Sequence, residues 1–115
     1  MLSDKARQVR IQAIESLGKV KAKLALSHLH KILTSESDDF QIRNTTVQAI
    51  ANIASQESID VLKKIATSDE EQVQNSLSAI DALGKIGTKE AEDTLIDILK
   101  SRDEIYQIRA IMALD

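Results

Sequence analysis

The chain has 115 residues, of which 43% are hydrophobic and 29% are charged, with a formal net charge of −3. This mix is typical of one globular domain and excludes a disordered chain. Because there is no cysteine, disulfides and thiolate chemistry are excluded, and the acidic balance disfavours a strongly basic nucleic-acid binder. No apolar run reaches the roughly 18 residues of a membrane span, and no secretory signal pattern is present, so we expect a cytoplasmic protein.

The composition favours helices over strands. The chain has no proline, three glycines and two aromatic residues, but 15 Ile, 12 Leu and 13 Ala. A β-sandwich or barrel would need more turn glycines and more aromatic strand residues. Apolar residues recur at helical spacing. The pattern predicts seven helices near residues 3–19, 21–34, 39–54, 57–67, 70–85, 88–100 and 103–114.

Local signals predict how several of these helices pack, begin and end. The apolar face of the second helix is expected to contain Leu24, Leu26, Leu29, Ile32 and Leu33. Ser68 with Glu71, and Ser101 with Glu104, fit capping boxes that would start the fifth and seventh helices. Gly87 fits a helix C-terminus. Gly18 and Gly84 lie earlier in their helices, where we expect them to admit a neighbouring helix at close range.

The chain repeats itself every 30 to 36 residues. The string Ala-Ile-x-x-(Leu/Ile) begins at Ala13, Ala49, Ala79 and Ala110. A second string, Gln-(Val/Ile)-(Arg/Gln), precedes each copy and begins at Gln8, Gln41, Gln72 and Gln107. One helix pair of this length cannot bury its apolar face alone, whereas stacked pairs share a continuous core. We therefore expect an all-α chain, an α-solenoid of about three and a half helix pairs forming a single domain over residues 1–115.

These units resemble HEAT-like repeats of the short variety first associated with phycobilisome lyase subunits. The first unit carries the pattern as Asp4…Val9-Arg10…Ala13-Ile14…Leu17-Gly18, and the third as Asp69…Val73-Gln74…Ala79-Ile80…Leu83-Gly84. The resemblance covers essentially the whole chain and implies the fold rather than an activity. Because the chain stops where a Leu-Gly helix end is expected, we also expect it to be part of a longer array.

The resemblance implies a ladder of Asp–Arg pairs between neighbouring units. Carried over to this sequence, the structural ladder consists of Asp4–Arg10, Asp38–Arg43 and Asp103–Arg109. An Arg guanidinium can donate two parallel hydrogen bonds to a carboxylate. The sequence departs from the family pattern at Gln74, which keeps hydrogen bonding but loses the charge. That departure is expected to break the ladder beside Asp69.

Three clusters of polar residues are candidates for catalytic, metal-binding or nucleic-acid-binding sites, and none is favoured as such a site by its pattern. His28 and His30 point about 200° apart on a helix and therefore cannot share a metal ion. The carboxylates at 90, 93 and 97 lie on one helix face, but Lys89 and Lys100 accompany them as on an ordinary charged surface. The basic stretch holds Lys19, Lys21, Lys23, His28, His30 and Lys31. It is interpreted as a solvated face, because no aromatic residue that could stack on a base lies nearby.

Charge is distributed unevenly along the sequence. Residues 1–57 contain eight basic and six acidic residues, a net charge of +2, whereas residues 58–115 contain seven and twelve, a net charge of −5. Opposite charge on the two halves favours end-to-end self-association of copies, a heterologous contact.

The sequence therefore predicts a non-catalytic scaffold or adaptor that binds another protein and needs no cofactor or metal. Partner-binding residues are predicted on the second helix of each pair, at Lys31, Asp60, Lys64 and Asp93. Two alternatives stay open: a phycobilin lyase-like subunit assisting chromophore attachment, and a nucleic-acid-binding helical repeat. Scarce aromatic residues weigh against the first and the net charge weighs against the second.

Overall fold

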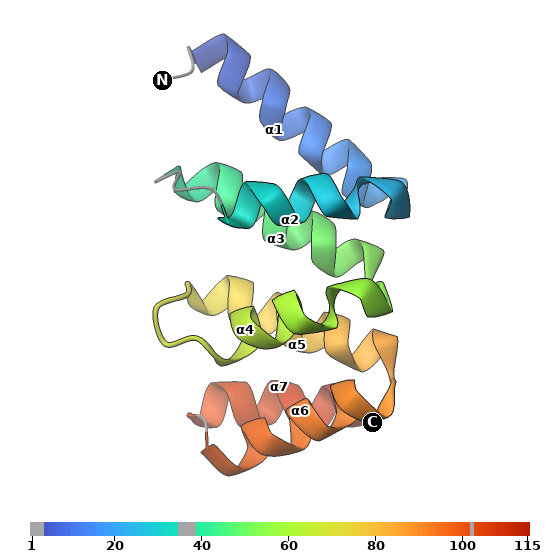
Figure 1. Ribbon diagram of the computed structural model, residues 1–115. Coiled ribbons are helices and arrows are strands. Elements are labelled where there is room, and N and C mark those ends of the chain that lie inside the picture. Colours follow the sequence, from blue (N-terminus) through green and yellow to red (C-terminus); the bar gives the residue numbers. More distant parts are fainter. Residues whose placement is uncertain (1–3, 35–38, 102) are drawn as a thin grey trace. The chain divides into compact units, whose positions relative to one another are not determined.

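The computed structural model describes residues 4–34, 39–101 and 103–115, and within these ranges every regular element is helical (Figure 1). The elements are α1 (Asp4–Lys19), the 3-10 helix η1 (Lys23–Ala25), α2 (Leu26–Thr34), α3 (Phe40–Ile53), the 3-10 helix η2 (Gln56–Ser58), α4 (Ile59–Thr67), α5 (Val73–Ile86), α6 (Lys89–Ser101) and α7 (Glu104–Leu114). The predicted all-α fold with seven α-helices is confirmed over this part of the chain. The helices form two compact units, Met1–Ile53 and Ala54–Asp115.

In the first unit, α1 and α2 both pack against α3 (Figure 1). Its core consists of branched apolar side chains from all three helices: Ile11, Ile14, Leu26, Leu29, Ile32, Ile42, Val47 and Ile50. Full burial of such a side chain contributes about 1.5–3 kcal/mol. α1 approaches α3 closely at Gly18, where an added Cβ atom would lie 2.7 Å from the Cα atom of Ala49. The expected role of Gly18 is confirmed.

In the second unit, α5 contacts α4, α6 and α7, and α6 also packs against α7. Its fully buried core includes Leu62, Ile80, Leu83, Leu95 and Ile98. Ser76 is fully buried and donates a hydrogen bond of 3.0 Å to the carbonyl oxygen of Ile65, which joins α5 to α4. A Cβ atom at Gly84 would lie 2.8 Å from both the Cβ atom and the carbonyl oxygen of Ala113. Gly84 therefore allows close packing of α5 and α7, as expected.

The end of α1 changes the start of the next helix. The N–H of Ala22 donates to the carbonyl of Leu17 at 2.9 Å, and the N–H of Lys21 donates to that of Gly18 at 3.1 Å. These bonds form a Schellman motif, and Lys21 adopts the left-handed conformation that it requires, with φ of 52°. A 3-10 turn follows, so α2 begins at Leu26 rather than at 21. Leu24, expected on the apolar face, is instead fully exposed.

Both predicted capping boxes are wrong. Ser68 ends α4 in an extended conformation, its hydroxyl accepts from the N–H of Glu70, and Gln72 is the N-cap of α5. Ser101 is the last residue of α6, and Asp103 is the N-cap of α7. In both cases the helix begins later than the motif predicts, with Val73 as the first residue of α5 and Glu104 as the first residue of α7.

Gly87 ends α5 as predicted. It has a φ of 66°, in the left-handed region that favours glycine, and its N–H donates to the carbonyl of Leu83 at 3.1 Å.

Candidate interaction surface

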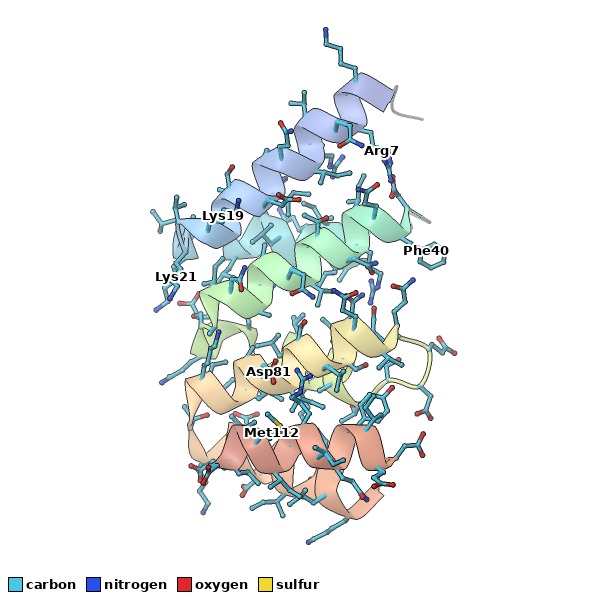
Figure 2. The ribbon with its side chains drawn as sticks, turned by 180° about the vertical axis from the view of Figure 1, so that it is seen from behind. Arg7, Lys19, Lys21, Phe40, Asp81 and Met112 are labelled. Atoms are coloured by element: carbon cyan, nitrogen blue, oxygen red, sulfur yellow. The ribbon has the colours of Figure 1, made fainter. Side chains whose placement is uncertain are left out.

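A polar cluster joins α1 to the start of α3. Arg7, labelled in Figure 2, lies on α1. It donates two hydrogen bonds to Asp39, from Nε to Oδ2 at 2.6 Å and from Nη2 to Oδ1 at 3.0 Å, and a third to Oε1 of Gln41. Oδ1 of Asp39 also accepts from the backbone N–H groups of Gln41 and Ile42, so Asp39 caps α3. These bonds, those from Arg7 above all, lower the pKa of Asp39 from 3.8 to about 2, against the opposing effect of burial.

In the second unit, an ion pair joins α7 to α5. Nη1 of Arg109 on α7 donates to Oδ2 of Asp81 on α5 at 2.8 Å. A neighbouring side chain, Gln107, donates to the carbonyl of Leu99 at the end of α6. Arg43 makes the same kind of bond in the first unit, to the carbonyl of Leu33 at 3.3 Å. Side chains at the start of α3 and α7 therefore satisfy carbonyls at the end of the preceding helix.

The predicted ladder is only partly tested by this geometry. Arg109 is paired with Asp81 and not with Asp103, which is exposed at the N-cap of α7, so the proposed Asp103–Arg109 pair is wrong. Arg10 is exposed. The side chain of Asp4 and the whole of Asp38 lie outside the described residues, and their pairing with Arg10 and Arg43 stays a prediction.

One face of α7 carries four exposed large apolar side chains, which we call the α7 face. The exposed fractions of Ile105, Ile108, Ile111 and Met112 are 51%, 51%, 58% and 64%. The opposite side of the same helix, with Tyr106 and Ala110, is buried. α7 therefore has apolar side chains on two opposite sides, one buried and one exposed.

A shallow groove adjoins the α7 face. It has a volume of about 410 Å³ and is lined by Asp81, Gly84 and Lys85 of α5 and by Met112 and Ala113 of α7. Figure 2 shows Asp81 and Met112 on these neighbouring helices. The groove sets a carboxylate and an ammonium beside the apolar stripe, an arrangement that suits a partner with an apolar centre and a polar rim.

Two protein-family models match the chain. A model described as HEAT repeats matches residues 1–77, more than half of the chain. The chain belongs to the HEAT repeat family. A second model, described as PBS lyase HEAT-like repeat, matches residues 77–101. No curated protein matches the sequence.

The partner-binding residues predicted for this HEAT repeat protein are all exposed. Lys31 lies on α2, Asp60 and Lys64 lie one turn apart on α4, and Asp93 lies on α6. None of them belongs to the α7 face or lines the groove beside it. Their contact with a partner stays a prediction.

The remaining polar candidates are distributed over the helix surfaces. His28 is exposed and His30 is half-buried, while Glu90, Asp93 and Asp97 are exposed along α6. Within the described ranges, no three His, Asp or Glu side chains are grouped so that they could hold a metal ion. Lys19 and Lys21 are exposed around the turn after α1 (Figure 2). Val20 and Lys23 in the same turn are exposed as well. No helix in the described part of the chain is both long and apolar enough to cross a membrane.

The α7 face was not among the sites predicted from the sequence, although the repeat contained the signal. Aligning Ala110 with Ala13 places Ile108 and Ile111 at the positions of Ile11 and Ile14. Those two residues are each only 3% exposed in α1, where the next repeat packs on them. In this HEAT repeat protein, α7 therefore presents the residues of a repeat-packing face in exposed positions.

Proposed function

We propose that this HEAT repeat protein is a non-catalytic module that binds another protein, and that the α7 face is its docking surface. The observation that supports this function is the clustering of Ile105, Ile108, Ile111 and Met112, each more than half exposed, on one helix. Single exposed apolar residues are ordinary, whereas contiguous ones mark interaction sites. HEAT repeats commonly mediate protein binding, which agrees with this assignment.

The chemistry of the face specifies the kind of partner. Its centre is aliphatic, and its edge in the groove carries Asp81 and Lys85. A protein segment with an apolar stripe would remove the centre from water, while its polar groups would meet the two charged residues at the rim. A few central side chains should carry most of the binding energy. Ile108 lies between Ile105 and Ile111 along α7 and occupies that central position, whereas Met112 borders the groove.

Two other functions have weaker support. Chromophore attachment is suggested by the lyase-type repeat at residues 77–101. However, of the two aromatic residues, Tyr106 is buried, so only Phe40 at the start of α3 could stack on a bilin. An absorbance shift on mixing the chain with a free bilin would favour that function. Nucleic-acid binding would use the exposed lysines after α1, and a gel shift at low salt that disappears in Lys21→Glu would favour it.

Quantitative capture from a lysate of the source organism tests the protein-binding function. Tagged wild type is compared with Ile108→Asp on the α7 face and with Ile96→Asp, a matched control at an isolated residue of α6 that is 40% exposed. We expect one dominant protein to be retained by the wild type and the control and reduced at least about tenfold with Ile108→Asp. Equal retention by all three chains would contradict the assignment of the face. Circular dichroism verifies that both variants stay folded.

A further inference from the structure

We propose that the α7 face binds the outer face of α1 in a second copy of this chain, so that copies associate head to tail. The outer face of α1 consists of Ala6, Val9 and Ala13, bordered by Lys5 and Arg10, and all five residues are exposed. This inference rests on the proposed function, because it names the partner of the same docking surface.

The internal repeat supplies the packing template. Within the first unit, Ile11 and Ile14 of α1 are buried, and Gly18 at the end of α1 lies against Ala49 of α3. In the repeat, Ala13 occupies the position of Ala49. Ala13, the equivalent of Ala49, is therefore exposed in α1. Ile108 and Ile111, the equivalents of Ile11 and Ile14, are exposed in α7.

The two faces complement each other in side-chain size. The outer face of α1 has one alanine on either side of Val9, whose exposed fraction is 61%. The α7 face is built of isoleucines and a methionine. Large side chains on one helix pack best into the depression that small side chains leave on the other. Two α7 faces would instead place large residues against large residues.

Charge at the two faces is complementary as well. Arg7 on α1 donates to the carboxylate of Asp39 at the start of α3. Aligning Ala110 with Ala13 places Glu104 of α7 at the position of Arg7. The charge at this position is thus negative in α7 and positive in α1. A helix that packs on the α7 face would therefore need a cation near its start. Lys5, in the first turn of α1, supplies that cation.

A complementation experiment tests the proposal with two exposed-site variants. Ile108→Glu blocks the α7 face but leaves α1 intact, whereas Val9→Glu blocks the outer face of α1 but leaves α7 intact. Sedimentation velocity is measured for each chain alone, for the wild type and for an equal mixture, across a wide concentration range at low salt. Circular dichroism verifies that each chain stays folded.

We expect the wild type to form species that grow with concentration and each variant alone to stay monomeric. The mixture should form a dimer and nothing larger, because it retains one intact pair of faces. A wild type that stays monomeric, or a mixture that does so while the wild type associates, would overturn the proposal. Association of Val9→Glu alone would show α7-to-α7 contact and would also overturn it. If the wild type is monomeric but lysate capture still depends on Ile108, the proposed function stands with another occupant.

Discussion

At the scale of single residues, Gly84 and Gly18 set how closely neighbouring helices pack. Replacing glycine by alanine inside a helix normally stabilises it by up to about 1 kcal/mol. Here the new methyl group of Gly84→Ala would meet Ala113 at 2.8 Å, including its carbonyl oxygen. We therefore expect the opposite sign, a loss of about 1–3 kcal/mol of unfolding free energy.

Urea unfolding of Gly84→Ala and Gly18→Ala measures this loss. The exposed substitution Gln12→Ala in the middle of α1 serves as the control and should change stability by less than about 0.5 kcal/mol. A midpoint of Gly84→Ala at or above that of the wild type would mean that α5 and α7 are not in close contact there.

Asp39 provides a pH-dependent contribution at the same scale. Its pKa falls from 3.8 to about 2 on folding because its charged form accepts bonds from Arg7 and from the backbone of α3. The stabilisation is therefore complete above about pH 5 and is lost as pH falls through 3.8 toward 2. Asp39→Asn keeps a helix-capping side chain but has no charge to lose.

Thermal unfolding of wild type and Asp39→Asn between pH 7 and pH 2 isolates this contribution, since the other carboxyls are common to both chains. We expect the wild type to be the more stable at neutral pH and the difference to shrink steadily below pH 4. A difference that stays constant down to pH 2 would rule out an ionised Asp39 bound to Arg7.

At the scale of the helix, the turn after α1 stores backbone strain. Lys21 adopts φ of 52° at the position where a Schellman motif favours glycine. The left-handed conformation costs a non-glycine residue roughly 1–2 kcal/mol. Lys21→Gly is therefore expected to raise the unfolding free energy by about 1 kcal/mol. Lys23→Gly, two residues later in η1, removes the same charge without relieving a left-handed residue and should not raise it. Equal effects of both substitutions would attribute the gain to lysine removal instead.

Helix number and type follow from the sequence because apolar periodicity is a local property. Leu29, Leu62 and Leu95 lie buried on the second helix of their pairs as the spacing predicts. Helix starts were harder to predict, because Ser68 satisfies a capping motif and yet closes the preceding helix. The motif fixes neither helix start, because Gln72 is the N-cap of α5 and Asp103 is the N-cap of α7.

Ion-pair partners were beyond sequence reasoning for a different reason. Arg109 and Asp81 lie 28 residues apart, on α7 and α5. Their contact depends on the register of the two helices, which the close approach at Gly84 fixes. The family pattern pointed instead to Asp103, at the N-cap of the same helix as Arg109. The α7 face, by contrast, could have been found from the sequence by aligning Ile108 and Ile111 of α7 with Ile11 and Ile14, which are buried in α1.

At the scale of the whole molecule, the uneven charge of the sequence gives the proposed head-to-tail contact a testable salt dependence. The first 57 residues carry a net charge of +2 and the remaining 58 carry −5. Added salt shortens the screening length from about 10 Å at 0.1 M to about 3 Å at 1 M. Self-association of the wild type should therefore weaken as salt is added.

A charge exchange assigns that dependence to one pair. Glu104→Lys and Lys5→Glu should each weaken association about twofold to fivefold, the effect of losing an exposed ion pair. The chain carrying both substitutions should recover most of the wild-type affinity, because opposite charges then meet again with their signs exchanged between α7 and α1. Glu90→Lys, the same change in the first turn of α6, is the control and should leave association unchanged. If the double variant associates no more tightly than the single ones, the two residues do not meet. Head-to-tail docking would then have to rest on the apolar contacts of Ile108 and Ile111 alone.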